Sequence, residues 1–187
     1  IEAGFPPGVL NIVQGRGPTV GQAIAEHPQV KAISFTGSTV TGARIASVAA
    51  MQFKKVSLEM GGKNPAIVDA NADVEDAALK TSWGRMCNGG QACIAPDYVL
   101  AHESVAQRFT DALVKEVTAM YNPRGEGFDK NPEYPRIINA RHFERIRDLI
   151  EDARAKGATI VMGGEYKADE RYLAPTGNNA FLFYLRV

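Results

Sequence analysis

The stretch Val30-Lys31-Ala32-Ile33-Ser34-Phe35-Thr36-Gly37-Ser38-Thr39 decides the fold of the first part of the chain. Its apolar, β-branched first half predicts a strand, and its hydroxyl-rich end can cap a helix. A helical pattern follows over residues 40–51, and Lys55-Val56-Ser57-Leu58-Glu59 predicts a second strand. Two strands separated by one helix favour parallel pairing through a right-handed crossover. The stretch therefore indicates an α/β fold.

The residues before this stretch extend the same pattern. Residues 9–13 predict another strand, which runs into the turn Gly15-Arg16-Gly17-Pro18 and a helix over residues 19–27. We therefore predict a doubly wound parallel sheet, a Rossmann-like half domain, over residues 1–60. Sheets of this kind bind ligands at the carboxyl ends of their strands.

The residues after this half domain predict part of a second α/β domain, at residues 61–176. Apolar periodicity and turn residues predict a strand at 65–69, a helix at 73–86, a strand at 98–101, helices at 104–120 and 140–156, and a strand at 159–162. Residues 177–187 are rich in apolar side chains, and the sequence offers no further strand to cover them. We interpret them as an atypical tail.

Composition excludes several classes of function. Lys plus Arg and Asp plus Glu each number 21, so the net charge is zero and no basic field favours nucleic acid or an anionic membrane. No apolar run reaches the length of about 18 residues that a membrane helix needs. The two cysteines and the scattered histidines lack metal-ligand spacing. We expect no metal, no membrane or nucleic-acid partner, and a cytoplasmic location.

Cys93 is the candidate nucleophile. It follows Asn88-Gly89-Gly90-Gln91-Ala92, a glycine-rich segment that can expose a thiol and offer backbone N–H groups to an oxyanion. The alternative is a buried, inert thiol, which is common for cysteine. Cys87 fits that alternative better, because Trp83 and Met86 indicate a packed helix beside it.

Glu59 is the candidate general base. It ends an apolar strand and precedes Met60-Gly61-Gly62, so its carboxylate is expected in the cleft where the strands stop. The alternative, that Glu59 is only a solvated charge at the end of a strand, explains its position equally well.

Two strand-to-helix turns could bind phosphate groups. Gly15-Arg16-Gly17-Pro18-Thr19-Val20-Gly21 and Thr36-Gly37-Ser38-Thr39 both place small residues at a helix N-terminus, which favours an anion. The first is one residue longer than the dinucleotide-binding fingerprint, and an ordinary turn explains it as well. A plain N-cap explains the second equally well.

Three motifs that are weak signals singly are together specific enough to indicate a protein family. In chain order they are Phe35-Thr36-Gly37-Ser38-Thr39, Leu58-Glu59-Met60-Gly61-Gly62-Lys63-Asn64-Pro65 and Gly90-Gln91-Ala92-Cys93. They resemble the aldehyde dehydrogenase superfamily of NAD(P)-dependent, non-phosphorylating enzymes. Glu59 and Cys93 are 93 − 59 = 34 residues apart, the interval that this family places between its base and its nucleophile.

The resemblance covers residues 3–176 and extends to a branch of the superfamily. Two further segments are similar to class 3, which includes coniferyl aldehyde dehydrogenases: Cys93-Ile94-Ala95-Pro96-Asp97-Tyr98 and Arg136-Ile137-Ile138-Asn139-Ala140-Arg141-His142-Phe143. Residues 1–60 would then be the C-terminal half of the dinucleotide-binding domain. Residues 61–176 would be the N-terminal part of the catalytic domain.

The resemblance implies oxidation of a small-molecule aldehyde to a carboxylate with NAD or NADP. Cys93 would attack the aldehyde to form a thiohemiacetal, and hydride would then pass to the nicotinamide. Glu59 would activate the water that hydrolyses the thioester, and the Cys93 N–H would help to hold the oxyanion. Five further residues would lie along the cofactor: Gly17 and Pro18 on the adenosine side, Ser38 at the pyrophosphate, and Gly37 and Met60 at the nicotinamide.

The resemblance also implies that the chain is a fragment. The family's oxyanion-binding asparagine and ribose-binding lysine precede the position that matches Ile1, and its Glu-x-Phe-Gly-Pro segment follows Thr176. We therefore expect little or no dehydrogenase activity from the 187-residue chain alone, and a homo-oligomer for the full-length protein. The alternative is a non-catalytic truncated paralogue that at most binds nucleotide or a partner chain.

Overall fold

The computed structural model describes residues 3–179. The chain divides after Gly61 into two compact units, unit 1 up to Gly61 and unit 2 from Gly62. Each unit contains a pair of parallel strands joined by a helix, so the predicted α/β class is confirmed.

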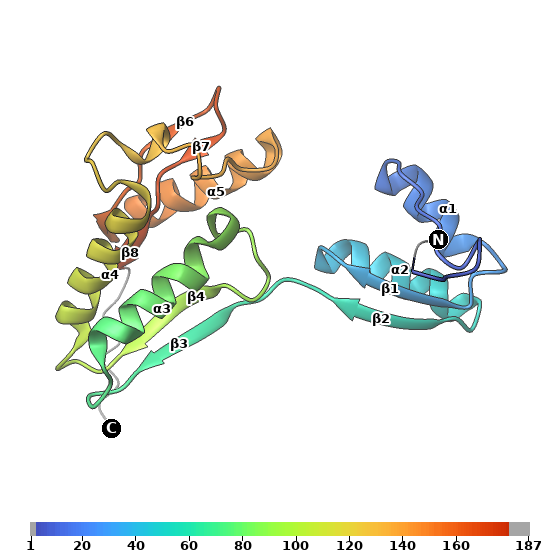
Figure 1. Ribbon diagram of the computed structural model, residues 1–187, viewed down its shortest axis with the longest axis horizontal. Coiled ribbons are helices and arrows are strands. Elements are labelled where there is room, and N and C mark those ends of the chain that lie inside the picture. Colours follow the sequence, from blue (N-terminus) through green and yellow to red (C-terminus); the bar gives the residue numbers. More distant parts are fainter. Residues whose placement is uncertain (1–2, 180–187) are drawn as a thin grey trace. The chain divides into compact units, whose positions relative to one another are not determined.

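Unit 1 is a single strand–helix–strand crossover preceded by a short helical segment (Figure 1). Its elements are η1 (Gly17–Gly21), α1 (Gln22–Glu26), β1 (Ala32–Thr36), α2 (Thr39–Met51) and β2 (Lys55–Glu59). β1 and β2 are parallel, and their register runs from Ala32 opposite Lys55 to Thr36 opposite Glu59. The predicted parallel pairing is therefore confirmed, and β2 has the predicted bounds.

The start of α2 is capped by a hydroxyl, as the sequence predicts. Ser38 is the N-cap residue, and its Oγ accepts a hydrogen bond from the Thr41 N–H at 3.3 Å. Such a bond satisfies one of the N–H groups that have no partner inside the helix. Among residues 3–179, no acceptor takes the N–H of Thr39 or Val40. The first turn of α2 therefore keeps two free donors.

The prediction of a strand at residues 9–13 is wrong. These residues form no strand, and the side chains of Val9, Leu10, Ile12 and Val13 are exposed. Their β-branched composition favours extended backbone, but a strand also needs a hydrogen-bonded neighbour. Within the described part of the chain, β1 and β2 pair with each other, and neither pairs with this segment.

A buried lysine joins α1 to the turn before β2. Lys54 is only 8% exposed, and its Nζ donates to the carbonyl oxygens of Ala25 at 2.6 Å and His27 at 2.8 Å. These carbonyls lie at the C-terminal end of α1, where backbone oxygens lack partners inside the helix. Lys54 therefore satisfies the end of a helix that is too short to be stable by itself.

Replacing Lys54 by methionine is expected to destabilise unit 1 by about 1–3 kcal/mol, because the Ala25 carbonyl loses its donor and the His27 carbonyl keeps only the Val30 N–H. Faster hydrogen exchange in peptides that cover β1 and β2 would report the loss. Lys31→Met is the matched control, since the Lys31 Nζ also donates to a carbonyl, that of Pro28 at 2.8 Å, but at an exposed position. Equal effects of the two substitutions would contradict the prediction.

Unit 2 contains the second crossover and the helices that cover it (Figure 1). Its elements are β3 (Asn64–Val68), α3 (Val74–Met86), η2 (Cys87–Gly90), β4 (Pro96–Ala101), α4 (Ala106–Tyr121), η3 (Phe128–Lys130), α5 (Ala140–Ala155), β5 (Thr159–Met162), β6 (Tyr166–Lys167), β7 (Tyr172–Leu173) and β8 (Gly177–Asn179). β3 and β4 are parallel, with a register shift between Asn64 and Pro65.

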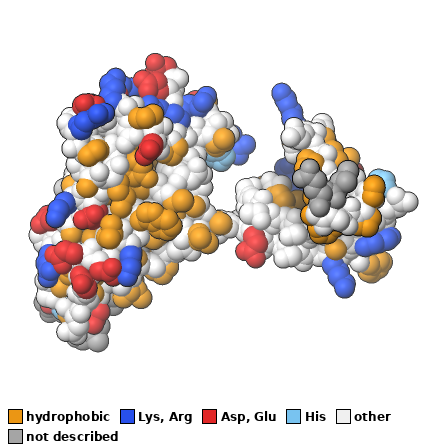
Figure 2. All heavy atoms as spheres, in the orientation of Figure 1, with side chains coloured by type: hydrophobic (Ala, Val, Ile, Leu, Met, Phe, Trp, Pro, Cys, Tyr) orange, Lys and Arg blue, Asp and Glu red, His pale blue; other side chains and the backbone are white. Residues whose placement is uncertain are grey.

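The core of unit 2 consists of three apolar clusters. The first joins β3, α3 and α4 through Val68, Val74, Ala78, Val105 and Phe109. The second surrounds Met86, Val117, Tyr134, Tyr172 and Ala174. The third comprises Ile137, Phe143, Ile150 and Leu173. Hydrophobic side chains also gather on the surface of this unit (Figure 2). Among the exposed apolar residues of the unit, Ile67 of β3 is 72% exposed and Trp83 of α3 is 70% exposed.

The predicted tail is described only in part. Gly177–Asn179 forms β8, which pairs antiparallel with β5. Residues 180–187 lie outside the described residues. In the range 3–179, no helix is both long enough and apolar enough to span a bilayer.

Candidate active site

Four of the predicted site residues lie at the carboxyl edge of the β1–β2 pair. Glu59 is the last residue of β2, and its backbone carbonyl accepts a hydrogen bond from the Gly37 N–H at 3.0 Å. Ser38 follows as the N-cap of α2. Met60 packs on the same helix, because a Cβ built at Gly42 would lie 2.9 Å from the Met60 Sδ. The Glu59 side chain itself is exposed.

Gly17 and Pro18 lie in η1, the helical segment that begins unit 1. Both are exposed, and a Cβ at Gly17 would meet no atom within 4 Å among the described residues. The glycine that the turn requires is Gly15, where a Cβ would lie 2.1 Å from the Val20 Cγ2. The Val20 side chain therefore occupies the space that a Cβ at 15 would need, whereas 17 tolerates a side chain.

Cys93 lies in a tight turn between η2 and β4. The turn of residues 92–95 is closed by the Ala95 N–H, which donates to the Ala92 carbonyl at 3.2 Å. The thiol is exposed. Across residues 3–179, no acceptor takes the Cys93 N–H. The turn therefore presents a thiol and a free backbone donor on the same residue.

The segment before Cys93 reverses direction through left-handed backbone. Asn88, Gly89 and Gly90 have φ angles of 53°, 64° and 77°. Glycine adopts this region without the penalty that a Cβ imposes. Close packing also limits size here, because a Cβ at Gly90 would lie 3.2 Å from the Arg85 side chain and backbone. The predicted glycine-rich turn is thus present, and it is tightly packed rather than open.

The interpretation of Cys87 as a buried, packed thiol is wrong. Its side chain is exposed, like that of Cys93. α3 ends at Met86, which is buried, and the backbone leaves helical geometry at Cys87 with a ψ of 125°. Trp83 lies on the solvent-facing side of α3. The apolar neighbours of Cys87 in sequence therefore do not enclose it.

Two amide side chains hold the Cys93 turn from other parts of unit 2. The Asn64 Nδ2 donates to the carbonyls of Cys93 at 2.8 Å and Ala95 at 3.0 Å. The Gln91 side chain accepts from the Ile138 N–H at 3.0 Å. Its Nε2 donates to the Asn88 carbonyl at 3.0 Å and the Arg136 carbonyl at 3.3 Å. The turn is therefore tied to β3 on one side and to residues 136–138 on the other.

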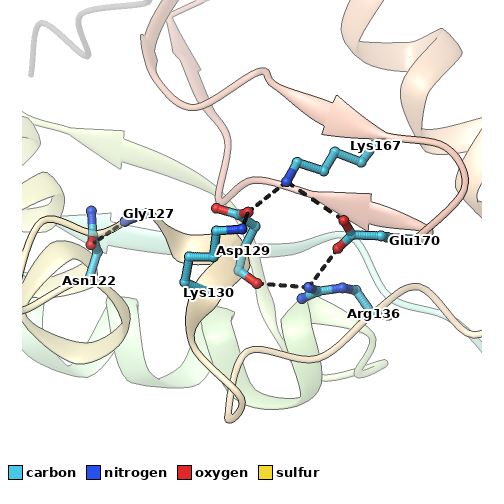
Figure 3. A network of polar contacts seen from close by, with 7 residues as sticks. All are labelled: Asn122, Gly127, Asp129, Lys130, Arg136, Lys167 and Glu170. Atoms are coloured by element: carbon cyan, nitrogen blue, oxygen red, sulfur yellow. Dashed lines mark hydrogen bonds and ion pairs between the residues drawn. The ribbon is translucent and has the colours of Figure 1, made fainter.

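An ion-pair network fixes the segment to which Gln91 is bound (Figure 3). Arg136 pairs with Glu170 at 3.1 Å and donates to the Asp129 carbonyl at 2.9 Å. Asp129 pairs with Lys167 at 2.7 Å and with Lys130 at 3.4 Å. Arg136 thus connects the Cys93 loop to β6 and to the turn that follows it.

A hollow of about 670 Å³ in unit 2 lies elsewhere. Its lining includes Ser82 of α3, Leu100 of β4, Phe109 of α4 and Met162 of β5. Cys93 does not line it. The hollow is therefore separate from the candidate nucleophile.

Glu59 and Cys93 belong to different units, Glu59 to unit 1 and Cys93 to unit 2. Within unit 1 the structure brings Glu59 together with Gly37, Ser38 and Met60. Within unit 2 it surrounds Cys93 with backbone and amide contacts.

Comparison with protein families identifies the family of the chain. The model of the aldehyde dehydrogenase family matches residues 1–177, nearly the whole chain. The chain belongs to the aldehyde dehydrogenase family. The resemblance carried by its three motifs is thereby confirmed at the level of the family.

Its relatives within the aldehyde dehydrogenase family are much longer. An aldehyde dehydrogenase of Agaricus bisporus is 41% identical over 94% of this chain and 35% of its own length. Human retinaldehyde dehydrogenase 3 is 42% identical over 94% of this chain and 34% of its own. The chain therefore spans about a third of the length of these relatives.

Solved structures of aldehyde dehydrogenases show the same fold. The NAD+ complex of the enzyme from Bacillus cereus has a TM-score of 0.81 and 40% identity, over 94% of this chain and 35% of that one. Lactaldehyde dehydrogenase from Escherichia coli has a TM-score of 0.80 and 36% identity, over 94% and 37% of the two chains.

Sequence reasoning missed Asn64 and Gln91. Both occur in the quoted motifs, one after Lys63 and the other two residues before Cys93. A polar amide inside a motif whose other members are small or reactive is a signal that could have found them. Their partners, however, are backbone carbonyls and N–H groups, which leave no trace in a sequence.

Asp129 makes the network pH-dependent. The hydrogen bond from Lys167 lowers the pKa of the Asp129 carboxyl below its usual range. A depressed pKa in the folded state stabilises the protein above the unfolded-state pKa and ceases to do so as pH falls through the folded value.

For Asp129→Asn we therefore expect a lower Tm at neutral pH and a difference from wild type that shrinks below about pH 4. A series of thermal unfolding curves across pH measures this. Asp148→Asn is the control, since Asp148 forms an ion pair with Arg147 but its side chain is 65% exposed. Exposed pairs contribute little. A difference for Asp129→Asn that stays constant through acid pH would argue against the ion pair as its source.

Proposed function

We propose that this chain carries the nucleophile and the general base of an NAD(P)-dependent aldehyde dehydrogenase. The observation that carries the proposal is the exposed Cys93 in a closed turn, where its own N–H has no acceptor among residues 3–179. Attack on a carbonyl needs a thiolate, and the resulting oxyanion needs a donor close to the attacking sulfur. Both groups belong to Cys93.

The proposed reaction divides the work between two residues. The Cys93 thiolate adds to the aldehyde carbon, and the carbonyl oxygen becomes an oxyanion that the Cys93 N–H stabilises. Loss of hydride leaves a thioester on the sulfur. Glu59 then removes a proton from a water molecule, which attacks the thioester carbon and releases the carboxylate and the thiol.

Unit 1 offers hydrogen-bond donors that suit the pyrophosphate of a dinucleotide. Ser38 caps α2, and the N–H groups of Thr39 and Val40 at this helix N-terminus have no acceptor within the described residues 3–179, which favours a pyrophosphate. When bound, the nicotinamide supplies the acceptor for the hydride. We propose that Gly37 and Met60 lie at the nicotinamide and that Gly17 and Pro18 lie on the adenosine side. The NAD+ complex of the Bacillus cereus relative supports NAD(P) use.

The family supports an aldehyde as substrate, and we propose a class 3 enzyme that forms a homo-oligomer. Relatives include enzymes named as chloroplastic, from Amaranthus hypochondriacus, and as peroxisomal, from Pisum sativum. We propose the cytoplasm for this chain, because its two cysteines are exposed and unpaired.

A chimera tests the proposal. Residues 3–176 of this chain would replace the matching segment of the Bacillus cereus aldehyde dehydrogenase, with which the chain shares 40% identity. Formation of NAD(P)H from an aldehyde panel, at rates typical of enzymes, is the expected result. A chimera that is folded and binds NAD+ but forms no NAD(P)H would instead favour a non-catalytic paralogue.

A further inference from the structure

Asn64 is the side chain that contacts the backbone of Cys93 directly. One nitrogen, Nδ2, donates to the carbonyls of both Cys93 and Ala95. An amide nitrogen has two hydrogens, so both are used on this turn. Asn64 is the first residue of β3 and pairs with Pro96 of β4. We call these two hydrogen bonds the Asn64 clamp. Asn64 is anchored in β3, and β3 pairs with β4, the strand that follows the Cys93 loop.

The contact fixes peptide orientation. A peptide unit is planar, so holding a carbonyl also sets the direction of the N–H in the same unit. Asn64 holds the Cys93 carbonyl, and the turn bond from Ala95 holds the Ala92 carbonyl. The second of these units contains the Cys93 N–H. Both peptide units that flank the Cys93 side chain are thus held in place.

Glycine at position 62 makes room for this clamp. A Cβ built there would lie 2.2 Å from the Cys93 carbonyl oxygen and 2.6 Å from the Asn64 Nδ2. Neither atom could move away without breaking the hydrogen bond. The neighbouring Lys63 points elsewhere, toward Asp97 at 3.4 Å, with its side chain 87% exposed.

We propose that Asn64 is a positioning residue that holds the Cys93 backbone so that its N–H faces the oxyanion formed at its own sulfur. The inference rests on the proposed function of Cys93 as nucleophile. Asn64 does not contact the reacting atoms. It acts through the peptide unit that follows Cys93 and through Ala95, whose N–H holds the Ala92 carbonyl and with it the unit that contains the Cys93 N–H.

Two reagents distinguish stabilisation of an oxyanion by the Cys93 N–H from mere exposure of the Cys93 thiol. Iodoacetamide alkylates a thiolate by direct displacement, in which a C–S bond forms, iodide leaves and no oxyanion appears. p-Nitrophenyl acetate acylates it through a tetrahedral oxyanion. The C–S bond forms there, the bond to p-nitrophenolate breaks, and that anion leaves with the electron pair. The ratio of acylation to alkylation at Cys93 therefore reports oxyanion stabilisation.

The experiment measures both rates at both cysteines of the 187-residue chain by peptide mass spectrometry. Asn64→Ala removes the donor, and Asn64→Asp keeps its shape but cannot donate. We expect each to lower the acylation-to-alkylation ratio at Cys93 by roughly tenfold, below the hundredfold to thousandfold typical of deleting a donor outright. Lys63→Ala is the matched control and should leave the ratio unchanged.

The outcomes are distinct. If Cys93 of the wild-type chain is acylated no faster than Cys87, the proposed nucleophile itself fails, whatever Asn64 does. If Cys93 is acylated faster but both variants keep the wild-type ratio, the positioning role is overturned. Hydrogen exchange across β3 and β4 completes the test. A variant that lowers both rates equally, or that opens these strands, assigns Asn64 a structural role and also overturns the proposal.

Discussion

Replacing Cys93 by serine in the chimera is expected to lower aldehyde oxidation by at least about a thousandfold. An alcohol is ionised far less than a thiol at neutral pH and cannot form the thioester from which the carboxylate is released. The turn of residues 92–95 should persist, because its contacts to the protein come from backbone carbonyls and not from the thiol. Steady-state NAD(P)H formation measures the loss.

Cys87 provides the control for this substitution. It is an exposed cysteine six positions earlier in the same segment. Cys87→Ser should leave the rate within about twofold of the parent chimera, since the proposal gives that thiol no role. Comparable losses for the two substitutions would mean that the chimera is sensitive to the segment as a whole, and Cys93 would lose its assignment.

Replacing Phe143 by alanine is expected to destabilise unit 2 by about 3–5 kcal/mol, the usual cost of removing a buried aromatic side chain. Phe143 is 2% exposed and belongs to the cluster with Ile137, Ile150 and Leu173. Its ring also meets that of Tyr166 edge to face, with centroids 6.1 Å apart. The residual cavity would lie beside residues 136–138, to which Gln91 is tied. Hydrogen exchange of α5 peptides over a urea series gives the free energy of unfolding.

Leu149→Ala is the control on the same helix. Leu149 is 57% exposed, so its loss should cost less than about 1 kcal/mol. The comparison holds helix propensity nearly constant and varies burial. A loss for Phe143→Ala no larger than that for Leu149→Ala would contradict the packing of α5 described above.

Local signals carried most of the prediction of the fold. β2 was predicted residue for residue, because Lys55-Val56-Ser57-Leu58-Glu59 lies between the end of α2 and the pair Gly61-Gly62. The N-cap of α2 followed from the hydroxyl of Ser38, whose partner is only three residues away. Such features depend on neighbours in sequence, so a pattern of residues is enough to find them.

The errors came from contacts that no local pattern contains. Residues 9–13 have the composition of a strand, but pairing requires a distant segment. Cys87 follows the buried Met86, but its own exposure is set by where α3 ends. For the site, Cys93 and Glu59 were predicted from the chemistry of their own side chains and their place in the motifs. The bonds from Asn64 to Cys93 and from Gln91 to Ile138 join residues 29 and 47 positions apart, so they could not be predicted.

The side-chain hydrogen bonds that hold the Cys93 turn require a particular amino acid at only one of the two positions that each bond joins. On one side of each is a specific amide, Asn64 or Gln91, and on the other is a backbone group of Cys93, Ala95 or Ile138. Every amino acid supplies a carbonyl, and all but proline supply an N–H. In a library of random substitutions, intolerance should therefore concentrate at the two amides, while position 138, whose side chain is 73% exposed, accepts many replacements. The number of positions that need a particular amino acid is therefore smaller than the number of hydrogen bonds that hold the turn.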